Sequence, residues 1–492
     1  MLFNTTDFLI FLPIVTVLYF LTPGKYRWLL LLSASYYFYM CWEPAYAFFL
    51  AGSTLVDYYC AIRMHKSTAA KERRNYLLLS LFINLALLFG FKYFDFFNVS
   101  LKSLLQPFNI FYDAPILNIA APVGISYYTF KKLSYIIEVY RAGSEPEKHL
   151  GKFALFVSFF PTVTAGPIDR AKDLLPQFNT VHKFDYSRVT GGLKLMAWGM
   201  FKKVVIADRL ALFVNLVYDK PHDYQGLTLI VATLFFSIQI YADFSGYTDM
   251  AIGMAQVLGY NLADNFNRPY FAVSITEFWR RWHISLTTWL RDYLFLPIAY
   301  AVSRRIKKDR LLNIKAESWA YAAGILFTML LCGLWHGANW TYVVWGGLHG
   351  LYLVLSFATR KYRKKWRKKL VKPKPKYLYK GVRILFTFSL VSFLWIFFRA
   401  QSMSDALYIV SHLFQGIGPL PGIFPEMTVE LSIALVSVGF MFIVHLLQPH
   451  DGIREMFARK PLVVRWIIYF LLMLAVMNSG HFSEIPFIYV QY

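Results

Sequence analysis

Long apolar runs separated by short polar segments recur along the whole chain. The first four cover residues 8–21, 28–42, 46–62 and 76–94. A helix of about 20 residues crosses the ~30 Å hydrocarbon core of a bilayer, so we expect these runs to form membrane helices. The run at 8–21 lacks the basic flank and the small-residue cleavage site of a signal peptide, which predicts a helix that is retained.

The second half of the chain continues this pattern. Runs at 319–335 and 341–358 are joined by the short turn Trp335-His336-Gly337-Ala338-Asn339, which predicts a helical hairpin. Further runs cover 382–398, 431–447 and 464–477. Together with the apolar middle of the chain, these runs predict an even number of crossings, about ten to twelve.

The middle of the chain, from 115 to 260, is apolar but interrupted. Proline and glycine break it at 122–126 and again at 160–167. Non-helical backbone at membrane depth is tolerated only where it is buried in protein or lines a cavity. We therefore expect re-entrant or broken helices here, whose threading hydropathy alone does not settle.

Composition agrees with the pattern. The 492 residues are 57% hydrophobic, 19% aromatic and only 16% charged, which excludes a soluble domain of useful size. The predicted fold class is an all-α polytopic membrane protein with re-entrant, broken and interfacial helices. We expect one integral-membrane unit over 1–492, with N-terminal spans (1–114), a core that carries the candidate chemistry (115–360) and C-terminal spans (381–492).

Basic residues are concentrated in the loops and give a net charge of +23. The segment from Arg360 to Lys380 holds twelve Lys and Arg and no acidic residue. In a soluble protein such a run points to nucleic acid, but between membrane spans it marks a cytoplasmic loop facing anionic lipid. The basic segments 63–74, 304–315 and 449–465 are placed on the same side. This orientation puts the N-terminus and the segments 95–113, 416–426 and 481–492 outside.

The stretch from Glu277 to Tyr293 carries a histidine in apolar surroundings and is predicted to form one helix. At 3.6 residues per turn its aromatic residues and His283 share a face, whereas Arg280 and Arg281 fall largely elsewhere. An interfacial helix with an aromatic belt and snorkelling arginines explains this pattern as well as a functional site does. Both interpretations stay open.

A second histidine, His336, follows the apolar run at 319–335. Eighteen steps of 1.5 Å from Glu317 to Trp335 rise about 27 Å, so His336 should lie deep in the membrane or toward the outer face. An ionisable side chain there costs about 2.5 kcal/mol or more, which favours a function or a water-filled cavity. Because neutral imidazole can take and return a proton, we predict that His336 is a general base. His349 in the next span is expected to be a packing residue.

Other polar residues in apolar stretches have more than one explanation. The charged residues of 202–209 are expected to lie on an amphipathic helix in the cytoplasmic interface rather than in a site. Asp243 and Asp249, set among aromatic residues, could act as acid or base, bind a cation or pair with nearby arginines. The three cysteines are isolated and odd in number, so we expect buried thiols and neither a disulfide nor a metal site.

Several motifs in order resemble the membrane-bound O-acyltransferase family over essentially the whole chain. They are Pro122-Val123-Gly124-Ile125-Ser126, Ala165-Gly166-Pro167-Ile168, Lys202-Lys203-Val204-Val205-Ile206-Ala207-Asp208, Asp243-Phe244-Ser245-Gly246-Tyr247, Phe278-Trp279-Arg280-Arg281-Trp282-His283-Ile284-Ser285-Leu286 and Trp335-His336-Gly337. The beginning, Met1-Leu2-Phe3-Asn4, and the ending, Pro486-Phe487-Ile488-Tyr489, resemble its bacterial alginate O-acetylation branch. One short motif is weak evidence, whereas this many in order are strong.

This resemblance implies helices around a central funnel and an enzyme that moves an acyl group from a cytoplasmic thioester to an extracytoplasmic polysaccharide. The donor would be acyl-CoA, acetyl-CoA in particular, with no bound cofactor. The essential histidine of the family's Trp-His-Gly turn corresponds to His336, and its second functional histidine to His283. The bacterial branch implies the plasma membrane and an extracytoplasmic partner that resembles SGNH hydrolases.

The residues themselves allow roles to be assigned within this picture. His283 is expected to orient the thioester or stabilise the oxyanion. Arg280 and Arg281 would attract the phosphates of coenzyme A, with lipid headgroups as the rival ligands. Further candidates for binding substrate or donor are Trp335, Asn339 and Asp243.

Two other classes of protein compete with the enzyme. A transporter or flippase for a polysaccharide precursor or lipid would also need broken helices and intramembrane charges, but the sequence has no clear internal repeat. A non-catalytic scaffold would leave the two histidines unexplained.

Overall fold

The computed structural model describes residues 1–141, 143–306, 309–311, 314–370, 376–416, 427–448, 461–482 and 487–488. Over these residues the fold is almost entirely helical, apart from a small hairpin of β1 (Arg310–Leu311) and β2 (Ile314–Lys315). Seven of the described helices are long and apolar enough to cross a membrane. The predicted all-α polytopic class is therefore confirmed, whereas the total of ten to twelve crossings stays a prediction.

The N-terminal helices follow the predicted runs closely. They are α1 (Thr6–Leu21), α2 (Arg27–Met40), α3 (Tyr46–Lys66), α4 (Ala70–Leu88) and α5 (Phe94–Leu105). A π-helical turn, Phe89–Tyr93, joins α4 to α5. The segment 95–113, which is expected to lie outside, is helical for more than half its length.

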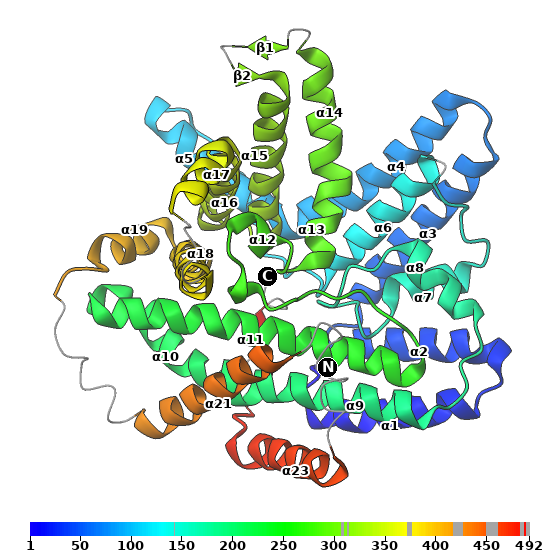
Figure 1. Cartoon of the computed structure of the whole chain (residues 1–492). Coiled ribbons are helices and arrows are strands. Elements are labelled where there is room, and N and C mark those ends of the chain that lie inside the picture. Colours follow the sequence, from blue (N-terminus) through cyan, green and yellow to red (C-terminus); the bar gives the residue numbers. More distant parts are fainter. Residues whose placement is uncertain are drawn as a thin grey trace.

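The middle of the chain combines a buried irregular segment with long helices. Its helices are α6 (Ile125–Tyr140), α7 (Leu150–Ser158), α8 (Ala171–Leu174), α9 (Tyr186–Met200), α10 (Asp208–Tyr218) and α11 (Leu227–Leu258). Residues 159–169 are buried without forming a helix, which confirms the predicted interruption there. In contrast, residues 227–258 form one unbroken helix that lies across the molecule (Figure 1).

Helices α9 and α11 approach each other closely along a row of glycines. A Cβ atom at Gly199 would lie 2.5 Å from the backbone oxygen of Gly246, and one at Gly192 would lie 2.5 Å from that of Gly253. Small residues at such crossings let two membrane helices make backbone contact. Helix α11 also packs against α1, α10 and the π-helical segment Phe201–Ala207.

The second half of the chain forms the upper part of Figure 1 and returns to the base. Its helices are α12 (Ile275–Trp279), α13 (Ile284–Leu290), α14 (Leu296–Arg305), α15 (Ala316–His336), α16 (Trp340–Ala358), α17 (Arg360–Leu370), α18 (Lys376–Arg399), α19 (Met403–His412), α21 (Thr428–Leu447) and α23 (Leu462–Ser479). The predicted hairpin is confirmed as α15 and α16. The predicted loop 416–426, apart from Gly416, and most of 449–465 and 481–492 lie outside the described residues.

The prediction of one continuous helix from Glu277 to Tyr293 is wrong. Helix α12 ends at Trp279, α13 begins at Ile284, and His283 between them has a left-handed backbone with φ of 42°. The loop before α12 supplies the reason, because the amide of Ile284 donates to the backbone oxygen of Asn265 at 2.9 Å. A tertiary hydrogen bond thus replaces a helical one at the break.

The prediction of an interfacial amphipathic helix at 202–209 is also wrong. These residues belong to a π-helical segment, Phe201–Ala207, and the start of α10, and all of them are buried. Lys203 lies 2.8 Å from both Asp208 and Asp243, and Lys202 lies 2.7 Å from Asp249. The charges point into the bundle because α11 supplies their partners, and those partners are lysines rather than the arginines considered for the two aspartates.

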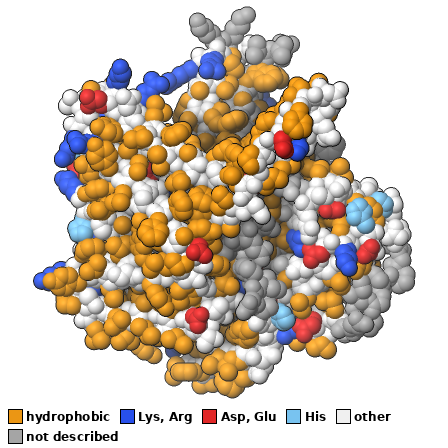
Figure 2. All heavy atoms as spheres, turned by 180° about the vertical axis from the view of Figure 1, so that it is seen from behind, with side chains coloured by type: hydrophobic (Ala, Val, Ile, Leu, Met, Phe, Trp, Pro, Cys, Tyr) orange, Lys and Arg blue, Asp and Glu red, His pale blue; other side chains and the backbone are white. Residues whose placement is uncertain are grey.

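The outer surface fits contact with lipid. Apolar side chains cover much of the face shown in Figure 2, where charged side chains are sparse. Cys60 and Cys332 are buried, as expected, whereas Cys41 is exposed, so the prediction of a buried thiol is wrong there.

Candidate active site

A cavity of about 480 Å³ lies beside the turn between α15 and α16. Its wall is formed by the junction of α4 and α5, the loop before α6, the start of α6 and the hairpin turn. The lining residues include Phe91, Lys92, Pro122, Gly124, Ser126, Tyr127, Thr164, Trp335, His336, Asn339 and Tyr342. Segments around Lys92, Gly124, Thr164 and His336, which are distant in sequence, therefore meet at this cavity.

Helix packing fixes His336 at this wall. A Cβ atom at Gly333 would lie 2.1 Å from the backbone oxygen of Tyr342, so α15 and α16 touch backbone to backbone just before the turn. The buried imidazole of His336 packs edge-on against Trp345 and Phe398, with ring centroids 5.1 and 5.3 Å away. The ring therefore has little freedom to move.

Asn339 shapes the turn itself. Its Oδ1 accepts the backbone N–H of Thr341 at 3.0 Å and so caps α16, and its Nδ2 donates to the backbone oxygen of Gln401 at 2.9 Å. Asn339 lines the cavity, but both ends of its amide are engaged by the protein. Its observed contacts are those of a residue that holds the turn in place.

The two histidines meet at Trp335. The indole of Trp335 lies 4.9 Å from the His336 ring and 6.1 Å from the His283 ring, measured between centroids. His283 is fully buried and packs edge-on against Phe244 of α11 at 4.7 Å. The left-handed backbone at His283 turns its side chain into the bundle, so the helix break that the sequence did not reveal builds part of the site.

Two hydrogen-bond donors beside the cavity have no partner among the described residues. They are the indole Nε1–H of Trp335 and the hydroxyl of Tyr127, and both are buried. Buried donors are nearly always paired in folded proteins, so each unpaired one calls for an explanation such as a ligand. Donors held rigidly in a dry site can bind a carbonyl oxygen or a developing oxyanion.

Sequence reasoning missed Lys92. Its Nζ donates to the backbone oxygen of Trp335 at 2.7 Å and lies 3.3 Å from Ser126 Oγ and 3.4 Å from the backbone oxygen of His336. It therefore satisfies carbonyls at the end of α15 that have no partner within the helix. The available signal was a lone lysine inside the apolar run at 76–94, now seen in a π-helical turn, a feature frequent at functional sites.

The other predicted site residues lie away from this cavity. Arg280 is exposed, and Arg281 pairs with Glu277 at 2.6 Å. Asp243 accepts hydrogen bonds from Lys203 and from the amide of Ile488, each at 2.8 Å. The structure thus brings together His336, His283, Trp335 and Asn339 but not the two arginines or Asp243.

His349 has the packing role that its position in the helix predicted. It is fully buried, and its Nδ1 accepts the indole N–H of Trp279 at 3.3 Å. Its ring also packs against Trp345, with centroids 4.9 Å apart.

Comparison with known proteins adds independent information. A family model described as the membrane-bound O-acyltransferase family matches residues 125–400, which include the whole cavity turn and both histidines. A probable alginate O-acetylase of Azotobacter vinelandii is 35% identical over 463 residues, which cover 93% of this chain and 86% of the relative. A peptidoglycan O-acetyltransferase of Helicobacter pylori is 33% identical, with coverage of 83% and 79%. A teichoic acid D-alanyltransferase of Streptococcus thermophilus is 31% identical, with coverage of 56% and 68%.

Proposed function

Because the chain belongs to the membrane-bound O-acyltransferase family, we propose that it moves an acetyl group from a cytoplasmic thioester across the membrane for O-acetylation of an extracytoplasmic polysaccharide. The names of the three relatives support an acyl transfer to a polymer of the cell envelope, and two of the three specify acetyl. The donor in this proposal is acetyl-CoA or another acetyl thioester. The alginate O-acetylation branch is favoured because the match to the Azotobacter vinelandii relative covers 93% of this chain.

The observation that carries the proposal is the position of His336. Its imidazole lines a cavity whose lining also includes Trp335 and Tyr127, and the indole N–H and the hydroxyl of these two residues are buried donors without a partner in the described part of the chain. A base and a pair of donors on one wall are the parts that acyl transfer needs.

In the proposed step His336 accepts the proton of the acceptor hydroxyl as its oxygen attacks the thioester carbonyl carbon. A C–O bond forms, and the carbonyl electrons move to oxygen, where the Trp335 and Tyr127 donors stabilise the negative charge. The C–S bond then breaks, and the imidazolium returns the proton to the leaving thiolate. General-base catalysis of this kind contributes roughly 10²–10⁴-fold to the rate. His283, whose ring centroid lies 6.1 Å from that of Trp335, keeps Trp335 and the donor in position.

The remaining parts of the proposal concern location and partners. We place the whole chain in a bacterial plasma membrane as a single unit, with its N-terminus outside. An extracytoplasmic SGNH-hydrolase-like protein would complete transfer to the polymer, and membrane lipids would contact the basic loops. Arg280, which is exposed, is available for the donor's phosphates, whereas Arg281 is already paired with Glu277.

The test compares His336→Ala with His349→Gln at matched protein levels in the membrane. His349→Gln is the control because His349 is an equally buried histidine on the same hairpin with a packing role. We expect His336→Ala to abolish polymer acetylation and acetyl transfer from labelled thioester by the purified protein, and the control to retain both. Normal acetylation by His336→Ala would contradict the proposal. Absence of any thioester turnover by the purified wild-type chain would favour a transporter instead.

A further inference from the structure

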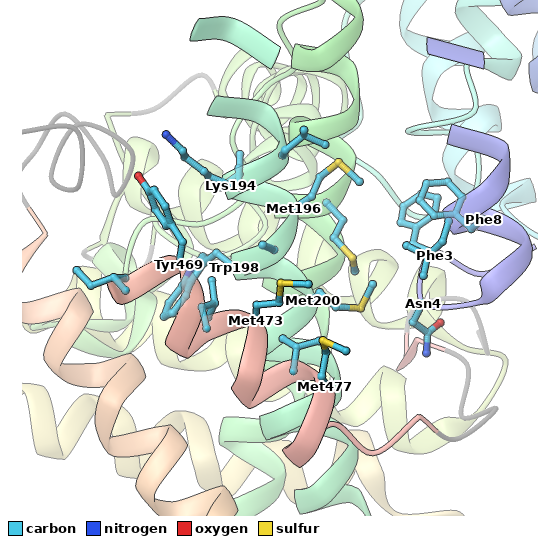
Figure 3. A pocket seen from close by; sticks show the side chains of 18 of the residues that line it. Phe3, Asn4, Phe8, Lys194, Met196, Trp198, Met200, Tyr469, Met473 and Met477 are labelled. Carbon is cyan, nitrogen blue, oxygen red and sulfur yellow. The ribbon is translucent and has the colours of Figure 1, made fainter. Parts of the chain in front are cut away.

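A second, larger hollow shares no lining residue with the histidine cavity. It has a volume of about 530 Å³ and runs between the N-terminal segment, α9 and the C-terminal helix α23 (Figure 3). Its walls are almost wholly apolar and include Phe3, Phe8, Met196, Trp198, Met473 and Val476. We call this hollow the α9/α23 groove.

Helix α23 forms one wall without being embedded in the protein. None of its residues is buried, and its main contacts are with α9 and the π-helical segment Phe201–Ala207. Methionines project into the space from both walls, among them Met196, Met200, Met473 and Met477 (Figure 3). Because methionine side chains are unbranched and flexible, such a lining adapts to a mobile apolar occupant.

One end of the groove is polar and positively charged. Lys194 Nζ lies 4.8 Å from the centre of the Tyr469 ring, and both side chains line this end (Figure 3). The Tyr469 hydroxyl and Arg465 Nε are buried and have no hydrogen-bond partner among the residues that the structure describes. Arg465 precedes Tyr469 by one helical turn and so lies on the same side of α23. Lys194 and Tyr469 therefore line this end of the groove, and Arg465 adjoins them one turn earlier on α23 without lining it.

The dimensions fit a single lipid chain. Phe482 follows Tyr469 by thirteen positions, and both line the groove. The helical part of this distance rises about 15 Å, near half of the ~30 Å hydrocarbon core. The charge at one end requires an anionic headgroup rather than a neutral one.

We propose that the α9/α23 groove is a binding site for one anionic phospholipid, with an acyl chain between α9 and α23 and the phosphate beside Lys194, Arg465 and Tyr469. The lipid would fill the space between α9 and α23 and hold α23 against the rest of the helices. The site is separate from the histidine cavity, so the proposal does not depend on the proposed acyl transfer.

The test measures lipid retained by the whole protein in detergent by native mass spectrometry, with added phosphatidylglycerol or phosphatidylcholine. We expect one phosphatidylglycerol per chain and at least tenfold lower retention of it by the double variant Lys194→Ala/Arg465→Ala. Retention of phosphatidylcholine should be weak and equal in both proteins. Lys25→Ala is the matched control, because Lys25 also lies over a tyrosine ring, at 4.7 Å from Tyr26, but does not line the groove.

A second measurement uses only the wild-type protein and so does not depend on how the variants fold. Phosphatidylglycerol with a photoreactive group at the end of its acyl chain should label peptides that contain 193–200 and 468–477. Equal retention of phosphatidylglycerol by the double variant and the control would overturn the proposal. Labelling confined to peptides outside these two ranges would also overturn the proposal. So would evidence that a second protein chain occupies the groove.

Discussion

Neutral imidazole is the least costly ionisable side chain to keep in a hydrocarbon environment, and the candidate site holds two of them, one in the hairpin turn and one between α12 and α13. His336 lines the cavity, whereas His283 lies near the same indole without lining the cavity. The two positions therefore predict unequal roles. A group at the wall can exchange a proton with a substrate, and a group behind the wall can only hold or polarise what lies in front of it.

The unequal roles predict unequal mutant rates. His336→Ala should lower kcat by roughly 10²–10⁴-fold, because no smaller side chain replaces a base. His283→Asn keeps a hydrogen-bonding group and should retain measurable activity, while His283→Ala should lose more. Rates of both single variants and the double variant, at equal amounts of folded protein, measure the coupling between the two residues. Equal losses in His283→Asn and His336→Ala would show that the histidines act as one catalytic unit.

The hydrogen bond from Lys92 to the backbone of Trp335 predicts that Lys92 positions His336, a role that a merely buried lysine would not have. Lys92→Met keeps the apolar stem but removes the donor from the Trp335 carbonyl, so the end of α15 that carries His336 should shift. A displacement of about 1 Å in an active site can cost 10²-fold in rate. We expect kcat to fall about 10- to 100-fold with little change in donor KM, and Lys92→Arg to recover part of the loss.

The control for Lys92 is Lys102→Met, which removes an exposed lysine from the same helical stretch. Lys102 pairs with Asp113 at the surface and lies outside the cavity. Its loss should leave kcat unchanged. A rise in KM without a change in kcat for Lys92→Met would instead assign Lys92 to substrate binding.

At the scale of elements, the sequence predicted the helices that depend on local pattern and failed where tertiary contacts decide. The hairpin of α15 and α16 was predicted because its apolar runs and its turn are local features. The break at His283 was not, because the amide of Ile284 and the side chain of Ser285 both bond to Asn265, which lies in a preceding loop. An amphipathic pattern cannot report a bond to a residue eighteen or more positions away.

The same reason explains which site residues were found. His336, Trp335 and Asn339 share one turn, so a single motif predicted all three. Lys92 and Tyr127 reach the cavity from other elements. In the sequence, only their position inside apolar runs distinguished them from other residues. Lys203 was assigned to an interface because its partner Asp243 lies on α11, forty residues away.

The buried ion pair between Lys203 and Asp243 predicts that Asp243 has a structural role. Removing one member of a buried ion pair costs about 3–5 kcal/mol, because the remaining charge stays buried without full compensation. Asp243→Ala should therefore lower the unfolding temperature in detergent clearly, toward the lower end of that cost because Asp208 still pairs with Lys203. Donor KM, measured well below the transition, should stay unchanged.

Asp113→Ala is the comparison, because this carboxylate is exposed and its loss should change stability by no more than about 0.5 kcal/mol. The sequence made Asp243 a candidate for donor binding. An increase in donor KM for Asp243→Ala with normal thermal stability would restore that assignment.

At the scale of the whole molecule, the position of the basic loops relative to the cavity predicts which side of the membrane the cavity faces. The cavity is lined by the loop before α6 and by Asn339, whereas the basic helix α17 follows at the far end of α16. With α17 in the cytoplasm, the cavity faces the outer side of the membrane. A thioester from the cytoplasm and a polymer from outside would then approach His336 from opposite sides.

Thiol labelling tests this direction. A chain with Cys41→Ser retains only the buried Cys60 and Cys332, and single cysteines can be added at two exposed positions, Lys364 in α17 and Asp113. Because positively charged loops stay in the cytoplasm, Lys364→Cys should react with a membrane-impermeant maleimide only in inside-out vesicles. Asp113→Cys should react only in intact cells, and serves as the matched control for reagent access. The reverse labelling pattern at both positions would show that the cavity faces the cytoplasm. An acceptor outside the cell would then lie on the side opposite the cavity opening, which would contradict the proposed direction of transfer.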